Sequence, residues 1–203
     1  MTTIISQLYT SRRILLDQLK NRGYAVDDYN HFSFNEVRVM YTNKQLDMLL
    51  EKEGKKIYIK HHFATKLRPN HVWEFLDDLY NYEEVLKNED ELIILTKDKP
   101  NDTLIKLMRN IYSTEKKYFN IFSVKNLQYN ILNHQMVPPH RIIADDEKKE
   151  IFERFNITGP EKFPEIDRFD KVGMLIGLRP DQIVEIIRPS RTAISSIYYR
   201  LCC

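Results

Sequence analysis

Apolar residues at helical spacing form the first pattern along the chain. The repeating positions are Ile4, Ile5, Leu8, Leu15, Leu16 and Leu19. Gly23 follows where a left-handed residue would end a helix, so this stretch is predicted to be an amphipathic helix. Ser33 and Glu36 then have capping-box spacing, which favours a second helix, although Phe34 and its apolar neighbours would also suit a strand.

Beyond residue 45 the pattern changes from helical spacing to alternation. Apolar and polar residues alternate on both sides of the charged turn from Glu51 to Lys55, which contains Gly54. This arrangement predicts a β-hairpin rather than a helix that stops at the glycine. Further helices and strands then follow, so the first part of the chain is predicted to be a mixed α/β domain. The predicted helices are residues 70–80, capped by Asn70, and residues 102–112, capped by Asp102; the predicted extended segments are 91–96, 118–124 and 127–132.

The stretch from His134 to His140 separates this part from the rest of the chain. Pro138 and Pro139 fix φ, remove two backbone donors and keep Val137 out of the helical region, so the stretch must be extended or turned. We name it the seam. It divides the chain into a predicted N-terminal domain, residues 1–133, and a predicted C-terminal domain, residues 134–203.

The C-terminal part is predicted to be a small α+β domain with a short mixed sheet. Its predicted elements are extended segments at 141–143 and 163–166, helices that begin at Asp145 and Val172, and strands at 183–188 and 195–201 that pair as a hairpin. A unit of about 70 residues gains little stability from a core of its own. We therefore expect it to dock onto another protein.

Composition and charge exclude some classes of protein for this chain. Hydrophobic residues make up 42% of the chain and charged residues 30%, which is typical of a globular protein and excludes a wholly disordered tail. The net charge of +2 does not favour strong sequence-independent binding to nucleic acid or anionic lipid. No apolar stretch is long enough for a signal peptide or a membrane span, so an intracellular protein is expected. Cys202 and Cys203 are adjacent, which suits a reducing compartment.

Two constellations suggest chemistry, and each has a simpler explanation. His134 and His140 invite a metal site, but they lack helical zinc spacing and a third ligand, so backbone hydrogen bonds are the better explanation. Glu53 and Lys55 have the Glu-x-Lys form of magnesium-dependent nucleases, with Asp47 upstream as a second carboxylate. A charged hairpin tip explains the same residues. We predict no catalytic residue, no metal, no cofactor and no small-molecule substrate.

Two exposed polar segments are candidates for contacts with other molecules. The loop from Lys97 to Asp102 can approach a phosphate backbone through its lysines, although a solvated surface would have the same composition. The loop from Arg188 to Thr192 joins two predicted strands and exposes guanidinium and hydroxyl groups beside apolar residues, which suits docking onto another chain. A simple hairpin loop is the alternative.

An ordered set of residues in the C-terminal part resembles one protein family. His134, Val137, Pro138 and His140 fit the pattern His-x-x-Val-Pro-x-His of the fifth common subunit of eukaryotic nuclear RNA polymerases and of its archaeal counterpart. The family pattern continues in order and spacing along the rest of the chain. The residues that follow it are Phe163 to Ile166, Asp170, Val172, Gly177, Leu178, the run from Ile183 to Thr192, Tyr199 and Arg200. In the N-terminal part, Asn21-Arg22-Gly23-Tyr24 is similar to the eukaryotic members.

This resemblance implies a fold, a function and a set of contacts. It implies a nuclease-like α/β jaw domain without nuclease chemistry, and an assembly domain that binds the largest polymerase subunit and lies among the other subunits. The interface residues implied are His134, Val137, Pro138, His140, Arg188, Ser190, Thr192, Tyr199 and Arg200. The loop implied to lie near downstream duplex DNA, as a weak contact, contains Lys97, Lys99, Pro100 and Asn101. The implied protein is a non-catalytic subunit of a DNA-dependent RNA polymerase.

The chain also departs from the family pattern. Lys99 to Asp102 replace the usual threonine-proline-serine-alanine run, and Asp181 and Ile194 stand where many relatives have glycine. A composition rich in Asn, Lys, Ile and Tyr suggests a divergent copy from a large DNA virus, which would act in the virion and host cytoplasm; a cellular copy would act in the nucleus. The alternatives are a stand-alone magnesium-dependent nuclease that uses Glu53 and Lys55, and a free DNA-binding regulator.

Overall fold

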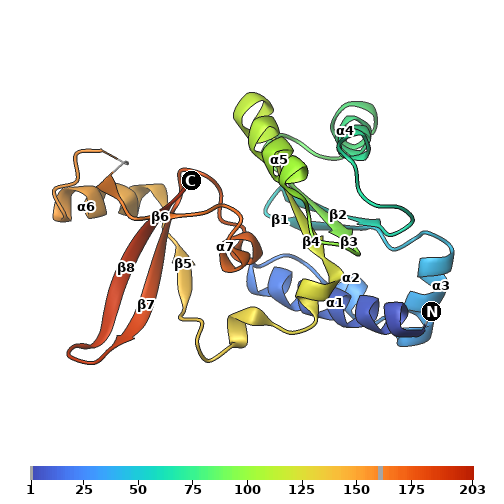
Figure 1. Cartoon of the computed structure of the whole chain (residues 1–203), viewed down its shortest axis with the longest axis horizontal. Coiled ribbons are helices and arrows are strands. Elements are labelled where there is room, and N and C mark those ends of the chain that lie inside the picture. Colours follow the sequence, from blue (N-terminus) through green and yellow to red (C-terminus); the bar gives the residue numbers. More distant parts are fainter. Residues whose placement is uncertain (1, 160–161) are drawn as a thin grey trace. The chain divides into compact units, whose positions relative to one another are not determined.

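The computed structural model describes residues 2–159 and 162–203 of the chain (Figure 1). These residues form two compact units, 1–129 and 130–203. Each unit has its own four-stranded mixed sheet, as expected of a mixed α+β protein. Within the same described ranges, no helix combines the length and apolar character needed to cross a bilayer.

The sheet of the first unit contains β1 (Met48–Lys52), β2 (Lys55–His62), β3 (Glu91–Thr96) and β4 (Tyr118–Ser123), in that spatial order. The predicted hairpin is confirmed, because β1 and β2 are antiparallel with Lys52 opposite Lys55. The other pairs are parallel. Every residue of β3 and β4 is buried, which explains why these strands are apolar without alternation.

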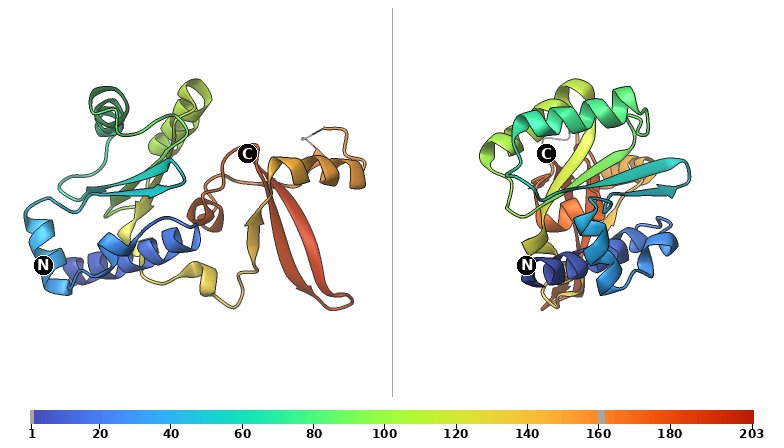
Figure 2. Two further views of the ribbon diagram at one scale, coloured as in Figure 1. Left: turned by 180° about the vertical axis from the view of Figure 1, so that it is seen from behind. Right: turned by 90° about the vertical axis from the view of Figure 1, so that its right-hand side faces the viewer.

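Helices cover both faces of this sheet (Figures 1 and 2). On one face lie α1 (Thr2–Asn21), α2 (Asp27–Asn30) and α3 (Phe34–Thr42); on the other lie α4 (Pro69–Asp77), its π-helical continuation η1 (Asp78–Tyr82) and α5 (Asp102–Glu115). The predicted first helix is confirmed, and Gly23 follows it with φ of 89°. The Ser33 and Glu36 capping box is formed, so the helical prediction there is right and the strand alternative is wrong.

Three local predictions for this part of the chain are wrong. Arg68 occupies the N-cap of α4 in place of Asn70, because Pro69 fixes φ at the first helical position. Asn101 caps α5 in place of Asp102, since its side chain accepts a hydrogen bond from the Leu104 N–H. Residues 127–132 are not extended. Leu127 ends the 3₁₀ helix η2 (Val124–Leu127), residues 128–129 form a bend, and Ile131 and Leu132 belong to the 3₁₀ helix η3 (Ile131–Asn133). Each helix is begun by a side chain that accepts a backbone N–H.

The sheet of the second unit has the order β5 (His140–Ile142), β7 (Ile183–Ser190), β8 (Ile194–Cys202) and β6 (Glu165–Ile166). Its first two pairs are antiparallel and the β8–β6 pair is parallel, so the predicted short mixed sheet and the predicted hairpin are both confirmed. The helices α6 (Asp145–Arg154) and α7 (Lys171–Ile176) also form where predicted. Gly177 ends α7 with φ of 77°.

Burial in the second unit is confined to one end of its long hairpin. Two small apolar clusters form the core, one around Ile151 and Phe163 and the other around Leu178 and Val184. The far ends of β7 and β8 are mostly exposed on both faces. Strands β5 and β6 cause this difference, because they pair only with residues near the base of the hairpin.

Candidate functional site

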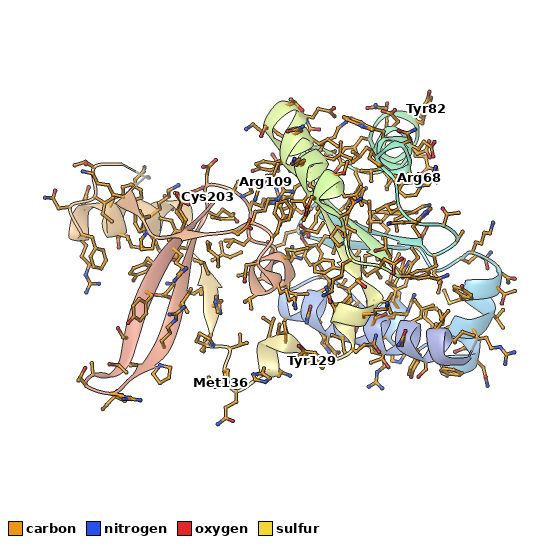
Figure 3. The ribbon with its side chains drawn as sticks, in the orientation of Figure 1. Arg68, Tyr82, Arg109, Tyr129, Met136 and Cys203 are labelled. Atoms are coloured by element: carbon orange, nitrogen blue, oxygen red, sulfur yellow. The ribbon has the colours of Figure 1, made fainter. Side chains whose placement is uncertain are left out.

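Backbone hydrogen bonds hold both histidines of the seam. The Met136 N–H donates to Nδ1 of His134 at 3.2 Å, and Nδ1 of His140 donates to the Pro138 carbonyl at 2.6 Å. The Met136 side chain between them is 81% exposed and points outward (Figure 3). In the part of the chain that the structure describes, no three histidine, cysteine or acidic side chains are grouped so as to hold a metal ion.

The far half of the β7–β8 hairpin exposes apolar and basic side chains together. Ile187, Ile197 and Tyr198 are each more than two-fifths exposed. The Arg188 guanidinium lies 5.2 Å from the centre of the Tyr198 ring, which extends this surface with a cation–π contact. We call the exposed side chains of residues 187–198 the hairpin tip.

The turn of the hairpin is built by Ser190. Its Oγ accepts hydrogen bonds from the backbone N–H groups of Thr192, at 3.4 Å, and Ala193, at 3.3 Å. Ile194 follows with φ of 61° and is 91% exposed, and Asp181 has φ of 69° near the base. Both residues therefore keep a left-handed backbone, the conformation that favours glycine, although they carry side chains.

Tyr199 and Arg200 form side-chain hydrogen bonds at the base of the hairpin, with residues of other strands of the same sheet. The Tyr199 hydroxyl donates to Glu185 Oε1 at 3.3 Å, and Arg200 donates to the Glu165 carbonyl at 3.1 Å. Glu185 also accepts from Arg141 at 2.8 Å. Desolvation and the adjacent Glu185 charge raise the pKa of Tyr199 above its ordinary value. The predicted interface residues differ in exposure. The exposed ones are His134, Arg188 and Thr192, and the partly buried ones are Val137, Pro138, His140, Ser190, Tyr199 and Arg200.

The exposed apolar residues of the hairpin tip are what sequence reasoning missed. Ile197 and Leu201 are four residues apart in β8, so their side chains lie on the same face of the strand. In the structure Leu201 is buried and Ile197 is exposed, since the flanking strands reach only the base. The short length of the predicted segment at 141–143, beside two much longer strands, was the available signal.

The loop from Lys97 to Asn101 follows β3 at the carboxyl edge of the parallel strands. Its backbone is fixed: the Lys97 carbonyl accepts from Ser123 Oγ at 3.0 Å, and the Asp98 carbonyl accepts from Thr96 Oγ1 at 2.7 Å. Lys97 and Lys99 are exposed. The loop borders a cavity of about 160 Å³ whose other wall is residues 63–67. It therefore presents lysines from a rigid base.

The carboxylates of the possible nuclease site do not converge. Asp47 precedes β1 and Glu53 follows it, so the strand holds them about 20 Å apart at roughly 3.3 Å per residue. Asp47 is engaged by Lys60 at 2.8 Å and by the His61 N–H at 2.8 Å. Glu53 lies exposed at the hairpin turn with φ of 49°. One magnesium ion cannot bind both side chains in this arrangement.

Comparison with known proteins assigns the second unit to a family. The family described as "RNA polymerase Rpb5, C-terminal domain" matches residues 129–202. An RNA polymerase subunit Rpo5 of Pyrococcus abyssi is 40% identical over 36% of this chain and 89% of its own length. The chain belongs to the Rpb5 family.

Relatives in this family differ in how much of the chain they match. The subunit rpabc1 of RNA polymerases I, II and III of Dictyostelium discoideum is 27% identical over 98% of both chains. The subunit RPABC1 of Caenorhabditis elegans is 40% identical over 39% of this chain. Similarity is thus strongest in the second unit, where the seam and the hairpin lie.

Proposed function

We propose that this chain is a non-catalytic subunit of a multisubunit DNA-dependent RNA polymerase and that its second unit docks on the largest subunit. The observation that carries the proposal is the family match over the second unit. In this unit the hairpin tip is exposed. In this proposal the boundary near residue 133 separates a jaw domain from an assembly domain.

The chemistry of the hairpin tip supports docking. Ile187 and Ile197 lie directly opposite each other across the two strands, so they form one apolar spot. Arg188 and Tyr198 add a guanidinium and an aromatic ring, and these residue types are enriched at protein interfaces. A partner that covers this spot would bury apolar area that the small core of the unit leaves in water.

The edges of the hairpin favour the same conclusion. Strand β6 pairs with β8 only at Leu201 and Cys202, and β5 pairs with β7 only from Val184 to Ile186, with one further bond from the Ile187 N–H to the Pro139 carbonyl. Toward the tip, the flanking strands therefore do not pair with the outer edges of β7 and β8. Unpaired strand edges are suited to hydrogen bonding with an added segment of a partner.

Recovery of the largest subunit from native lysate tests the proposal. We expect the tagged full chain to recover the largest subunit and Ile197→Asp to reduce recovery about tenfold, because it places a charge at the centre of the apolar spot. Arg188→Ala is expected to reduce it less. The control Ile4→Asp changes an exposed isoleucine of the first unit and is expected to leave recovery unchanged. Unchanged recovery after deletion of residues 134–203 would refute docking through the second unit.

We further propose that the first unit forms the lower jaw and that Lys97 and Lys99 approach downstream duplex DNA. The exposed lysines on a fixed loop support this contact, and Pro100 and Asn101 shape the backbone that follows. The contact is weak, since the chain carries a net charge of only +2. A free DNA-binding regulator would instead require substantial duplex affinity of the isolated chain.

The composition supports an origin in a large DNA virus with its own polymerase, and so a place in the virion and host cytoplasm. Genes for other polymerase subunits beside this one in a viral genome would support that origin. A cellular genome neighbourhood would overturn it and leave the nucleus as the place of action.

A further inference from the structure

The helix α4 and the π-helical turn η1 leave one side exposed. Their buried side consists of Val72, Leu76, Leu79 and Tyr80. On the other side Trp73 is 39% exposed and Tyr82 is 82% exposed. Figure 3 shows Tyr82 at the outer end of this element, with its side chain pointing away from the sheet. Two aromatic side chains are therefore presented to solvent by one continuous helical element.

The π-helical turn brings the exposed residues into two neighbouring rows. Asp77 lies four residues after Trp73, on the same side of an α-helix, and Tyr82 lies five residues further on, which is the spacing of a π-helix. Glu74, Asp78 and Glu83 have the same four and five spacing, and the Glu83 N–H donates to the Asp78 carbonyl at 2.8 Å. One row thus begins and ends in an aromatic residue, and the other consists of acids.

Glu84 adds a further exposed acid after these rows. We call the seven residues the acidic aromatic face: Trp73, Glu74, Asp77, Asp78, Tyr82, Glu83 and Glu84. None of its five carboxylates forms an ion pair with another residue that the structure describes. Asp77 Oδ1 accepts a hydrogen bond from the Asn81 amide at 2.9 Å, which is a neutral partner. The face therefore gathers five carboxylates without an ion-pair partner among the described residues, on a chain whose net charge is +2.

We propose that the acidic aromatic face binds a lysine- and arginine-rich segment of a partner protein. Guanidinium and ammonium groups can stack on Trp73 and Tyr82, while the carboxylates beside the rings accept their N–H groups. The same carboxylates repel phosphate, so nucleic acid does not fit this face. The contact involves no residue of the hairpin tip and is independent of docking on the largest subunit.

Trp73 is the single tryptophan of the chain, so its fluorescence reports on this face directly. The full chain is titrated with a peptide of nine arginines, and a peptide of nine glutamates is the charge control. We expect a saturable change in Trp73 emission with the arginine peptide alone, weakened by added salt. No saturable change, or an equal change with the glutamate peptide, would overturn the proposal.

Matched variants separate this face from non-specific attraction of a cationic peptide. The triple variant Glu74→Gln, Asp77→Asn, Asp78→Asn is expected to weaken binding about tenfold, because it removes three of the carboxylates. The double variant Asp27→Asn, Asp28→Asn neutralises exposed acids on α2 and is expected to change affinity less than about twofold. Equal losses in the two variants would show that the peptide binds by net charge alone and would overturn the proposal.

The variant Trp73→Phe tests the contribution of the tryptophan ring, with binding of the arginine peptide measured by calorimetry. Phenylalanine keeps an apolar ring but is a weaker cation–π partner than tryptophan. We expect affinity to fall about threefold. Unchanged affinity would refute stacking on this ring.

Discussion

Arg22 and Glu91, which are 69 residues apart in the chain, form an ion pair at 2.5 Å between the turn that follows α1 and the start of β3. Glu91 is almost completely buried, and its second oxygen accepts from Asn120 at 3.1 Å. Burial by itself would lower the pKa of Arg22, but the attraction and hydrogen bond of Glu91 outweigh it and raise the pKa. The Asn-Arg-Gly-Tyr stretch that resembles the eukaryotic family members therefore has a structural role, in which Arg22 fastens the first helix to the sheet.

The first prediction concerns this ion pair. Arg22→Met is expected to lower the free energy of unfolding by about 3 kcal/mol, because it leaves a buried carboxylate without its cation. The double variant Arg22→Met, Glu91→Gln is expected to recover more than half of that loss, since no buried charge remains. Urea unfolding followed by circular dichroism measures both. Additive losses in the double variant would contradict the assigned pairing.

The second prediction concerns Ile194, a β-branched residue with φ of 61°. Ile194→Gly is expected to raise the free energy of unfolding of the second unit by about 1 kcal/mol, because glycine adopts a left-handed backbone without steric cost. The control is Ile197→Gly. Ile197 lies in the same strand but does not have a positive φ, so glycine at this position is expected to lower the free energy of unfolding. Thermal unfolding measures the change. A loss of stability in Ile194→Gly would show that this turn is not strained.

The third prediction concerns pH. The His61 side chain is buried, and desolvation lowers its pKa despite the nearby Asp47 carboxylate. As pH falls below the unfolded value of about 6.5, the unfolded chain takes up a proton that folded His61 resists, so stability falls until the folded pKa is reached. His61→Phe is expected to flatten this dependence between pH 7 and 5. The matched control His31→Phe changes an exposed histidine and is expected to leave the slope unchanged. The free energy of unfolding at several pH values measures the slopes.

The fourth prediction concerns the loop after β3. In polymerase assembled with Lys97→Ala, Lys99→Ala, the slope of log affinity for downstream duplex against log salt is expected to decrease by about 1 to 2, at roughly 0.9 per lost phosphate contact. The control is Lys20→Ala, Lys55→Ala. These exposed lysines lie near the end of α1 and at the β1–β2 turn, toward the amino edge of the parallel strands. An identical change in both variants would argue against a local contact.

Much of the fold follows from local pattern. Helical spacing predicted α1, alternation around Gly54 predicted the β1–β2 hairpin, and the two apolar strands predicted the β7–β8 hairpin. The caps were less predictable. Asn101 and Asp102 are both good capping residues, and the choice between them depends on where the loop from β3 delivers the chain.

The candidate site was predictable in identity but not in accessibility. The seam and the loop from Arg188 to Thr192 were recognised from ordered motifs, yet the sequence did not show that Tyr199 is bonded within the unit while Ile197 is exposed. The exposure of a strand residue depends on how far the neighbouring strands extend. That length is set by contacts between distant segments.

The sequence by itself determined the element types, the seam and the family motifs, because periodicity, proline and glycine act over a few neighbouring residues. Only the tertiary structure decided the pairing of Arg22 with Glu91, the separation of Asp47 from Glu53 and the two exposed rows on α4 and η1. These depend on strand register, burial and the π-helical turn. Such properties arise from packing between residues that are far apart in the chain, which no short stretch of sequence specifies.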